Sequence, residues 1–198
     1  VNDAEGSMDA MREALTLDKE NTLIATAAAK CLERYGDLLG AIHAYEELAL
    51  ADPNRRGDYA REKSKIQATL GLTDDAIASA REVISASPGS PEAYRFFADA
   101  CFRLGRRDEG LDALRKAVRS DPSDTRMLME LADALVRAFR SDEAIELYQQ
   151  VLRRSEDLQG KMGVIRKLAD VHLERGTVVD LLANLERRGS TTDLKRET

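Results

Sequence analysis

The sequence contains no tryptophan, and its 198 residues include only two histidines, two cysteines and four prolines. Side chains that titrate near neutral pH or bind transition metals are therefore scarce. Neither His43 nor His172 stands in an arrangement that would suggest a zinc site, and the glycines stand singly rather than in a phosphate-binding loop. We expect no catalytic residue, metal site or cofactor in this chain.

Long apolar runs and clustered positive charge are also missing. No stretch approaches the roughly 20 apolar residues that span a bilayer, and the first five residues lack the basic and apolar regions of a signal peptide. The net charge of −6 argues against a nucleic-acid partner, because that affinity is built from clustered lysine and arginine. We expect no membrane insertion and, for this segment, a cytoplasmic location. Abundant alanine and the excess of arginine over lysine favour a bacterial, GC-rich genome.

What the sequence does contain is helical periodicity, clearest between residues 90 and 123. Ser90 is placed to cap a helix that begins at Pro91, where a missing N–H is tolerated. The apolar stripe of this helix is Tyr94, Phe97, Ala98 and Cys101, and the stripe of the next is Leu111, Leu114, Ala117 and Val118. Gly105 ends the first helix and Pro122 stops the second. The stretch predicts two antiparallel helices.

The same hairpin repeats along the chain. The closing proline recurs as Pro53, Pro88 and Pro122, with spacings of 35 and 34 residues. The turn glycine recurs as Gly36, Gly71, Gly105 and, after a small insertion, Gly176, while Phe139 interrupts the series. Small residues recur early in the second helix as Ala41, Ala76, Gly110 and Ala144, and in the first helix as Ala29, Ala98, Ala132 and Ala169. These marks predict an all-α chain of helix-turn-helix units of about 34 residues.

This pattern resembles the tetratricopeptide repeat, and the resemblance covers nearly the whole chain. It departs at Ser64, Gly110, Phe139 and Glu156, where the family carries other residues. The pentatricopeptide RNA binders have a similar period, but their basic character is missing here. The resemblance implies a right-handed α-α superhelix, a solenoid whose extended concave face binds protein partners.

Aligned on these marks, the chain divides into a single repeat domain and a tail. The domain covers residues 1–188, with a partial repeat over 1–21 and repeats over 22–56, 57–90, 91–124, 125–158 and 159–188. The polar tail, 189–198, is expected to be disordered. Both ends of the array carry apolar helices without the polar caps that solenoids normally have. We therefore expect either a segment of a longer protein or self-association through the terminal helices.

By resemblance, the first helix of each repeat lines the concave face. The residues carried over to it are Lys30, Arg34, Arg61, Lys65, Arg95, Asp99, Phe102, Arg126, Met129, Asp133, Arg166 and Asp170. Positive charge dominates the first two repeats, whereas Asp99, Asp133 and Asp170 place a carboxylate at one position of three consecutive repeats. Two interpretations explain these residues. They form a partner-binding surface, or they form an ordinary solvated helix face with ion pairs inside each helix.

Two groove chemistries of the family need asparagine on the inner helices: the clamp for chaperone tails and the asparagine ladder. The four asparagines, Asn2, Asn21, Asn54 and Asn184, fall elsewhere. We therefore expect a peptide partner to be held by charge pairing and by apolar contacts around Phe102, Met129 and Val136.

The leading hypothesis is a non-catalytic scaffold or adaptor that binds a peptide or protein segment in the groove. The alternatives are a structural or self-assembling spacer and a regulatory repeat region of a larger enzyme. Cys31 and Cys101 lie two repeats apart on apolar stripes, beyond the roughly 7 Å Cα separation that a disulfide allows, so both are expected to be free thiols.

Overall fold

The structure is a computed structural model that describes residues 6, 9, 10, 13, 22–179, 181–183 and 186. The tail over 189–198, Leu185 and most of the partial repeat over 1–21 lie outside the described residues. All regular structure in the described part is helical, which confirms the all-α class. The chain forms two compact units, Val1–Ser120 and Asp121–Thr198, which are taken in turn.

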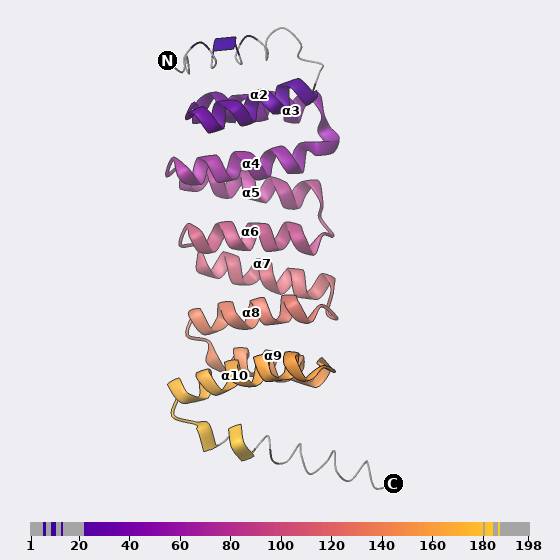
Figure 1. Cartoon of the computed structure of the whole chain (residues 1–198), viewed down its shortest axis with the longest axis vertical. Coiled ribbons are helices and arrows are strands. Elements are labelled where there is room, and N and C mark those ends of the chain that lie inside the picture. The colour runs from indigo at the N-terminus through magenta and orange to yellow at the C-terminus, as the bar shows by residue number, and fades with distance from the viewer. Residues whose placement is uncertain are drawn as a thin grey trace. The chain divides into compact units, whose positions relative to one another are not determined.

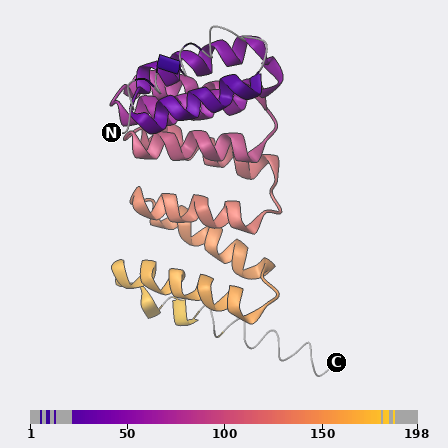
Figure 2. The ribbon, with the colours of Figure 1, turned by 45° about the horizontal axis from the view of Figure 1, so that its top comes forward.

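Residues 22–120 of the first unit form three helical hairpins (Figures 1 and 2). They are α2 (Thr22–Tyr35) with α3 (Leu38–Ala51), α4 (Arg56–Thr69) with α5 (Thr73–Ala86), and α6 (Pro91–Arg103) with α7 (Arg107–Ser120). A short 3-10 helix, η1 (Pro53–Arg55), joins α3 to α4. Each helix packs against the next one along the chain, from α2 through α7.

The second unit contains α8 (Thr125–Arg137), α9 (Ser141–Arg154) and α10 (Leu158–Glu174), again packed in chain order. The insertion expected before Gly176 lies in α10, which has 17 residues where the other first helices have 13 or 14. Beyond α10, the described residues from 178 onwards are helical.

The sequence signals for helix ends have the predicted structure. The Ser90 hydroxyl accepts a hydrogen bond from the Ala93 amide at 3.3 Å, and Pro91 opens α6. Gly36, Gly71, Gly105 and Gly176 all have left-handed backbone, with φ between 70° and 91°. Each is followed by an amide that donates to the carbonyl five residues earlier, as Arg106 does to Cys101 at 2.8 Å.

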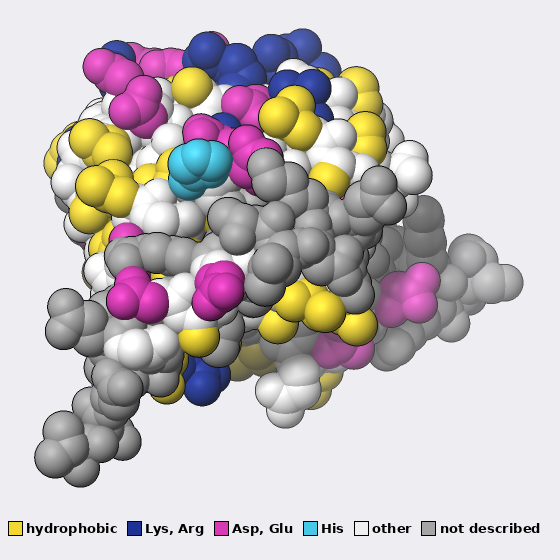
Figure 3. Space-filling view, turned by 90° about the horizontal axis from the view of Figure 1, so that it is seen from above, with side chains coloured by type: hydrophobic (Ala, Val, Ile, Leu, Met, Phe, Trp, Pro, Cys, Tyr) yellow, Lys and Arg dark blue, Asp and Glu magenta, His cyan; other side chains and the backbone are white. Residues whose placement is uncertain are grey.

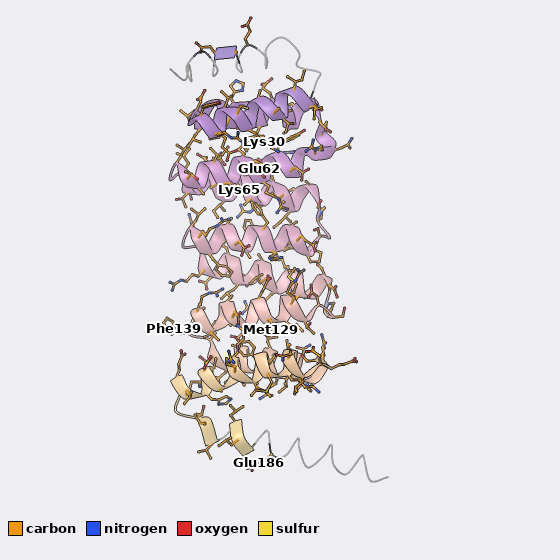
Figure 4. The ribbon with its side chains drawn as sticks, in the orientation of Figure 1. Lys30, Glu62, Lys65, Met129, Phe139 and Glu186 are labelled. Atoms are coloured by element: carbon orange, nitrogen blue, oxygen red, sulfur yellow. The ribbon has the colours of Figure 1, made fainter. Side chains whose placement is uncertain are left out.

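Phe139 takes the same conformation as these glycines. Its φ is 59°, and the Arg140 amide donates to the Leu135 carbonyl at 2.9 Å, so the α8–α9 turn is closed like the others. The side chain is 89% exposed and projects from the turn (Figure 4). A residue with a Cβ is strained in this region of the Ramachandran map, and no packing of the ring against the described residues offsets the strain.

Two further departures from the repeat pattern have local explanations. Ser64 stands where other repeats carry alanine, and its buried hydroxyl donates to the Ala76 carbonyl at 2.8 Å, which ties α4 to α5. Gly110 stands in the series of small residues that open second helices. A Cβ there would lie 2.7 Å from the Phe102 ring, so the missing side chain makes room for that ring.

The core follows the predicted positions closely. Ala29, Ala41, Ala76, Ala98 and Ala132 are each fully buried, as small residues must be where two helices approach closely. Tyr94 and Val118 are only half-buried, since both lie at the edge of their apolar stripes.

Candidate partner-binding face

The predicted groove residues lie on the first helices of both units. Lys30, Arg34, Arg61, Lys65, Arg95, Asp99 and Phe102 belong to α2, α4 and α6 of the first unit, and Arg126, Met129, Asp133, Arg166 and Asp170 belong to α8 and α10 of the second. Seven of these side chains are exposed: Lys30, Arg34, Lys65, Asp99, Arg126, Arg166 and Asp170. The other five are half-buried. The two groups belong to separate units and form two candidate surfaces.

A shallow, open pocket of about 180 Å³ lies on the first of these surfaces. It is lined by Thr26 and Lys30 of α2, Tyr45 of α3, Arg55 of η1, and Asp58, Tyr59, Arg61 and Glu62 of α4. Two predicted groove residues, Lys30 and Arg61, therefore meet in one concave site. We call it the tyrosine pocket.

The two tyrosines of this pocket are almost fully buried, with 1% and 2% of Tyr45 and Tyr59 exposed. Their rings stack with centroids 6.3 Å apart. Neither buried phenol oxygen has a hydrogen-bond partner among the described residues. Burial and the nearby carboxylates of Glu33 and Glu62 raise the pKa of Tyr45, so its hydroxyl stays a neutral donor.

The carboxylates that line the pocket are already engaged by neighbouring cations. Lys65 donates to both carboxylate oxygens of Glu62, at 2.9 and 3.1 Å, and Arg55 lies 3.5 Å from Asp58. The Arg61 guanidinium lies over the Phe96 ring, 4.5 Å from its centroid, where it is held by a cation–π contact. Among the described residues, no carboxylate pairs with Lys30 or Arg61. Figure 4 labels Lys30, Glu62 and Lys65.

In the second unit, Asp133 forms a closed network instead. Its carboxylate accepts a hydrogen bond from the Tyr148 hydroxyl at 2.5 Å and is bound by Lys167 of α10, with both oxygens 2.7 Å from Nζ. Burial and this hydrogen bond raise the pKa of Tyr148. The carboxylate predicted to face a partner thus links α8, α9 and α10, although 30% of its side chain stays exposed.

The two sites occupy the same repeat positions with opposite charges. Lys30 and Tyr45 stand 103 residues before Asp133 and Tyr148, in the register of Ala41 and Ala144. In the same way, Glu62 and Lys65 stand 105 residues before Lys167 and Asp170, in the register of Gly71 and Gly176. Only the tyrosine keeps its chemistry. Its hydroxyl has a carboxylate acceptor in the second unit and no hydrogen-bond partner among the described residues in the first.

The remaining predicted groove residues are less closely grouped. Phe102 packs its ring against Gly110 of α7, and Arg126 lies 3.7 Å from Asp124, the residue that caps α8. Met129 is half-buried on α8 (Figure 4). The contacts of Phe102 and Arg126 hold these two side chains on their own repeats.

The histidines and cysteines take the positions expected for structural residues. His43 is exposed on α3, while His172 is buried and its Nδ1 lies 2.8 Å from the Thr177 hydroxyl. Cys31 is half-buried and Cys101 buried, and both are free thiols. In the described part of the chain, no group of three His, Cys, Asp or Glu side chains could hold a metal ion. The described helices also include none long and apolar enough to cross a membrane.

Apolar side chains are exposed at the end of the first unit formed by α2 and α3 (Figure 3). They are Leu23, Ile24, Leu39 and Leu50. Self-association through the terminal helices stays a prediction, which light scattering over a range of protein concentrations tests.

The comparison with known families decides the identity of the fold. A family model described as "Tetratricopeptide repeat" matches residues 26–91, 61–125 and 97–158, which together span two thirds of the chain. The chain belongs to the tetratricopeptide repeat family. Repeats of this family are, in general, non-catalytic scaffolds for protein interaction.

Solved structures of tetratricopeptide repeat proteins share the fold at low sequence identity. A MamA protein is 22% identical, with a TM-score of 0.61 over 91% of this chain and 95% of that one. MamA from Desulfovibrio magneticus RS-1 is 20% identical, with a TM-score of 0.55 over 77% and 86%. YrrB, described as a repeat protein with an unusual peptide-binding site, is 15% identical, with a TM-score of 0.58 over 90% of both chains. Curated proteins offer no sequence match.

The tyrosine pocket and the Asp133 network contain side chains that the sequence analysis does not select. Tyr45 and Tyr59 fit the apolar pattern of core residues, and Glu62 and Lys167 lie on first helices outside the chosen positions. One signal in the sequence points to these side chains. Tyr45 and Tyr148 share a repeat position, but the residue fifteen positions earlier is Lys30 in one case and Asp133 in the other.

Proposed function

We propose that this repeat protein binds a peptide segment of a partner protein on the face formed by α2, α4 and α6. The observation that carries the proposal is the tyrosine pocket, where Lys30 and Arg61 meet on the predicted face with no carboxylate partner among the described residues. Such a pocket offers an anchor for one side chain of a bound peptide, and the exposed residues of α4 and α6 extend the surface beside it.

The composition of this face favours polar recognition. Lys65 is exposed on α4, and Asp99 on α6, while the half-buried Phe102 supplies an apolar contact. Paired charges on a rim contribute little affinity but fix register and select partners. YrrB, which is similar in fold, is described as having a peptide-binding site, and this is consistent with the same use of the fold here.

A displayed library of random peptides, selected against the whole chain, tests the proposal. We expect the enriched peptides to bind at least tenfold more weakly to the double variant Arg61→Glu, Lys65→Glu, because both changes reverse charge on the face. Lys116→Glu is the matched control, since Lys116 is exposed on α7, a second helix, and its binding should be unchanged. Enriched peptides that bind both variants equally, or a selection that enriches none, would overturn the proposed function.

A further inference from the structure

We propose that the tyrosine pocket binds an acidic side chain of the partner peptide, whose carboxylate accepts hydrogen bonds from Tyr45 and from Lys30. This inference rests on the proposed function, because it assigns the ligand class of the same face. Its basis is a difference between the two units. Tyr45 and Tyr148 occupy the same repeat position, but only the Tyr148 hydroxyl has a carboxylate acceptor.

The second unit shows what satisfies this tyrosine. Tyr148 donates to a carboxylate, Asp133, and a cation, Lys167, binds the same carboxylate. Charge-assisted hydrogen bonds of this kind are about twice as strong as those between neutral groups. One carboxylate is thus held between a phenol and an ammonium group, and each of its partners comes from a different helix.

In the first unit the phenol is retained and the carboxylate is missing. Lys30 occupies the position of Asp133, and an ammonium group has donors but no acceptor. Tyr45 and Tyr59 line the pocket beside this lysine, and their buried hydroxyls have no hydrogen-bond partner among the described residues. A buried hydroxyl without a partner is unfavourable, and an incoming acceptor relieves that penalty.

The lining of the pocket has one cation more than it has carboxylates, although Glu33, outside the lining, is also near Tyr45. Three cations, Lys30, Arg55 and Arg61, line it with two carboxylates, Asp58 and Glu62. Both carboxylates are held by neighbouring cations, Glu62 by Lys65 from outside the lining. Lys30 and Arg61 line the pocket without a carboxylate partner among the described residues, and Arg61 also lies over the Phe96 ring. A carboxylate placed here would lie among the side chains of Tyr45, Tyr59 and Lys30.

The size of the pocket limits the ligand to one side chain. Its volume of about 180 Å³ is below the roughly 300–1,000 Å³ typical of sites that enclose whole small molecules, and it is open to solvent. An aspartate or glutamate side chain of a peptide lying along the face fits this limit, because the peptide backbone can remain outside.

The experiment is an NMR titration of the whole chain with N-acetylglutamate N-methylamide, which presents one acidic side chain and no chain terminus. We expect saturable amide shifts around α2 and the start of α4. The matching glutamine compound should bind at least tenfold more weakly, because it lacks the charge. N-Acetylalanine, whose only carboxylate is terminal, should also bind more weakly. Tighter binding of either control compound, or no saturation by the glutamate compound, would overturn the proposal.

Two variants test the named contacts. Tyr45→Phe removes one donor and should weaken binding of the glutamate compound about tenfold, whereas Tyr35→Phe, at an exposed tyrosine of α2, should not. The double variant Lys30→Asp, Glu62→Lys copies the arrangement of Asp133 and Lys167, so it should fill the site internally and abolish binding. Unchanged binding to Tyr45→Phe and to the double variant would overturn the proposal.

The two proposals fail in different ways. If library peptides bind the face but show no acidic preference and tolerate Tyr45→Phe, the proposed function stands and the acidic ligand is wrong. If the glutamate compound binds the pocket but no library peptide depends on Arg61 and Lys65, the pocket is an anion site and the peptide-binding function is wrong.

Discussion

Tyr148 donates a hydrogen bond of 2.5 Å to the carboxylate of Asp133, and this contact joins α9 to α8. Lys167 of α10 binds the same carboxylate, so one side chain ties together three successive helices. The equivalent tyrosine of the first unit, Tyr45, has no such acceptor among the described residues. Two copies of one repeat position therefore differ in what their hydroxyl contributes to stability.

Replacing Tyr148 with phenylalanine should destabilise the protein by about 1–2 kcal/mol, because the variant loses a hydrogen bond to a charged group and leaves Asp133 with one partner fewer. Tyr45→Phe is the matched control and should not lower the free energy of unfolding, since its buried hydroxyl has no partner to lose and its removal relieves a desolvation penalty. Urea unfolding followed by circular dichroism measures both. Equal losses in the two variants would contradict the assignment.

Asp133 and Lys167 should be energetically coupled. A double-mutant cycle with Asp133→Asn and Lys167→Met is expected to give a coupling free energy of about 0.5–1 kcal/mol, because both side chains are partly shielded from solvent, at 30% and 39% exposure. The pair of Arg140 and Glu143, within α9 and its N-cap, is more exposed and should give less. A cycle for Asp133 and Lys167 that closes to zero would show that the contact is incidental.

Phe139 should be replaceable with a gain in stability. Phe139→Gly is expected to stabilise the protein by about 0.5 kcal/mol, because relief of the left-handed strain exceeds the entropy lost by a glycine on folding. Gly105→Ala, at the equivalent turn with φ of 78° and open space around its Cα, should destabilise it by about 1 kcal/mol. Thermal unfolding of both variants checks the pair. Destabilisation by Phe139→Gly would indicate that the aromatic ring supports the turn.

The buried thiol of Cys101 should make stability fall at alkaline pH. Burial and the Glu109 charge raise its pKa to about 11 from the usual 9. Between these values the unfolded chain releases the proton while the folded chain keeps it, so stability decreases as pH rises through this range. Between pH 8 and pH 11, the free energy of unfolding of Cys101→Ala should therefore fall by about 2 kcal/mol less than that of the parent protein. Urea unfolding at both pH values measures the difference, and equal losses would contradict the prediction.

The sequence by itself determined the repeat and its ends. Ser90, Pro91 and the four turn glycines act through local backbone chemistry, which depends on few neighbours, and the small residues such as Ala41 and Ala98 mark where helices must approach. These signals recur every 34 or 35 residues, so each copy reinforces the others. The same recurrence marks Phe139 as the exception at the turn position that glycine occupies in the other repeats.

Only the tertiary structure decided which side chains meet. The sequence places Lys30, Tyr45 and Glu62 on three different helices, and their common pocket appears once α2, α3 and α4 are packed. It likewise places Asp133 on the predicted binding face, whereas packing brings Tyr148 and Lys167 to its carboxylate. Periodicity fixes the face of a helix on which a residue lies. The hydrogen-bond partner depends on contacts between helices, which the periodic pattern of one helix does not contain.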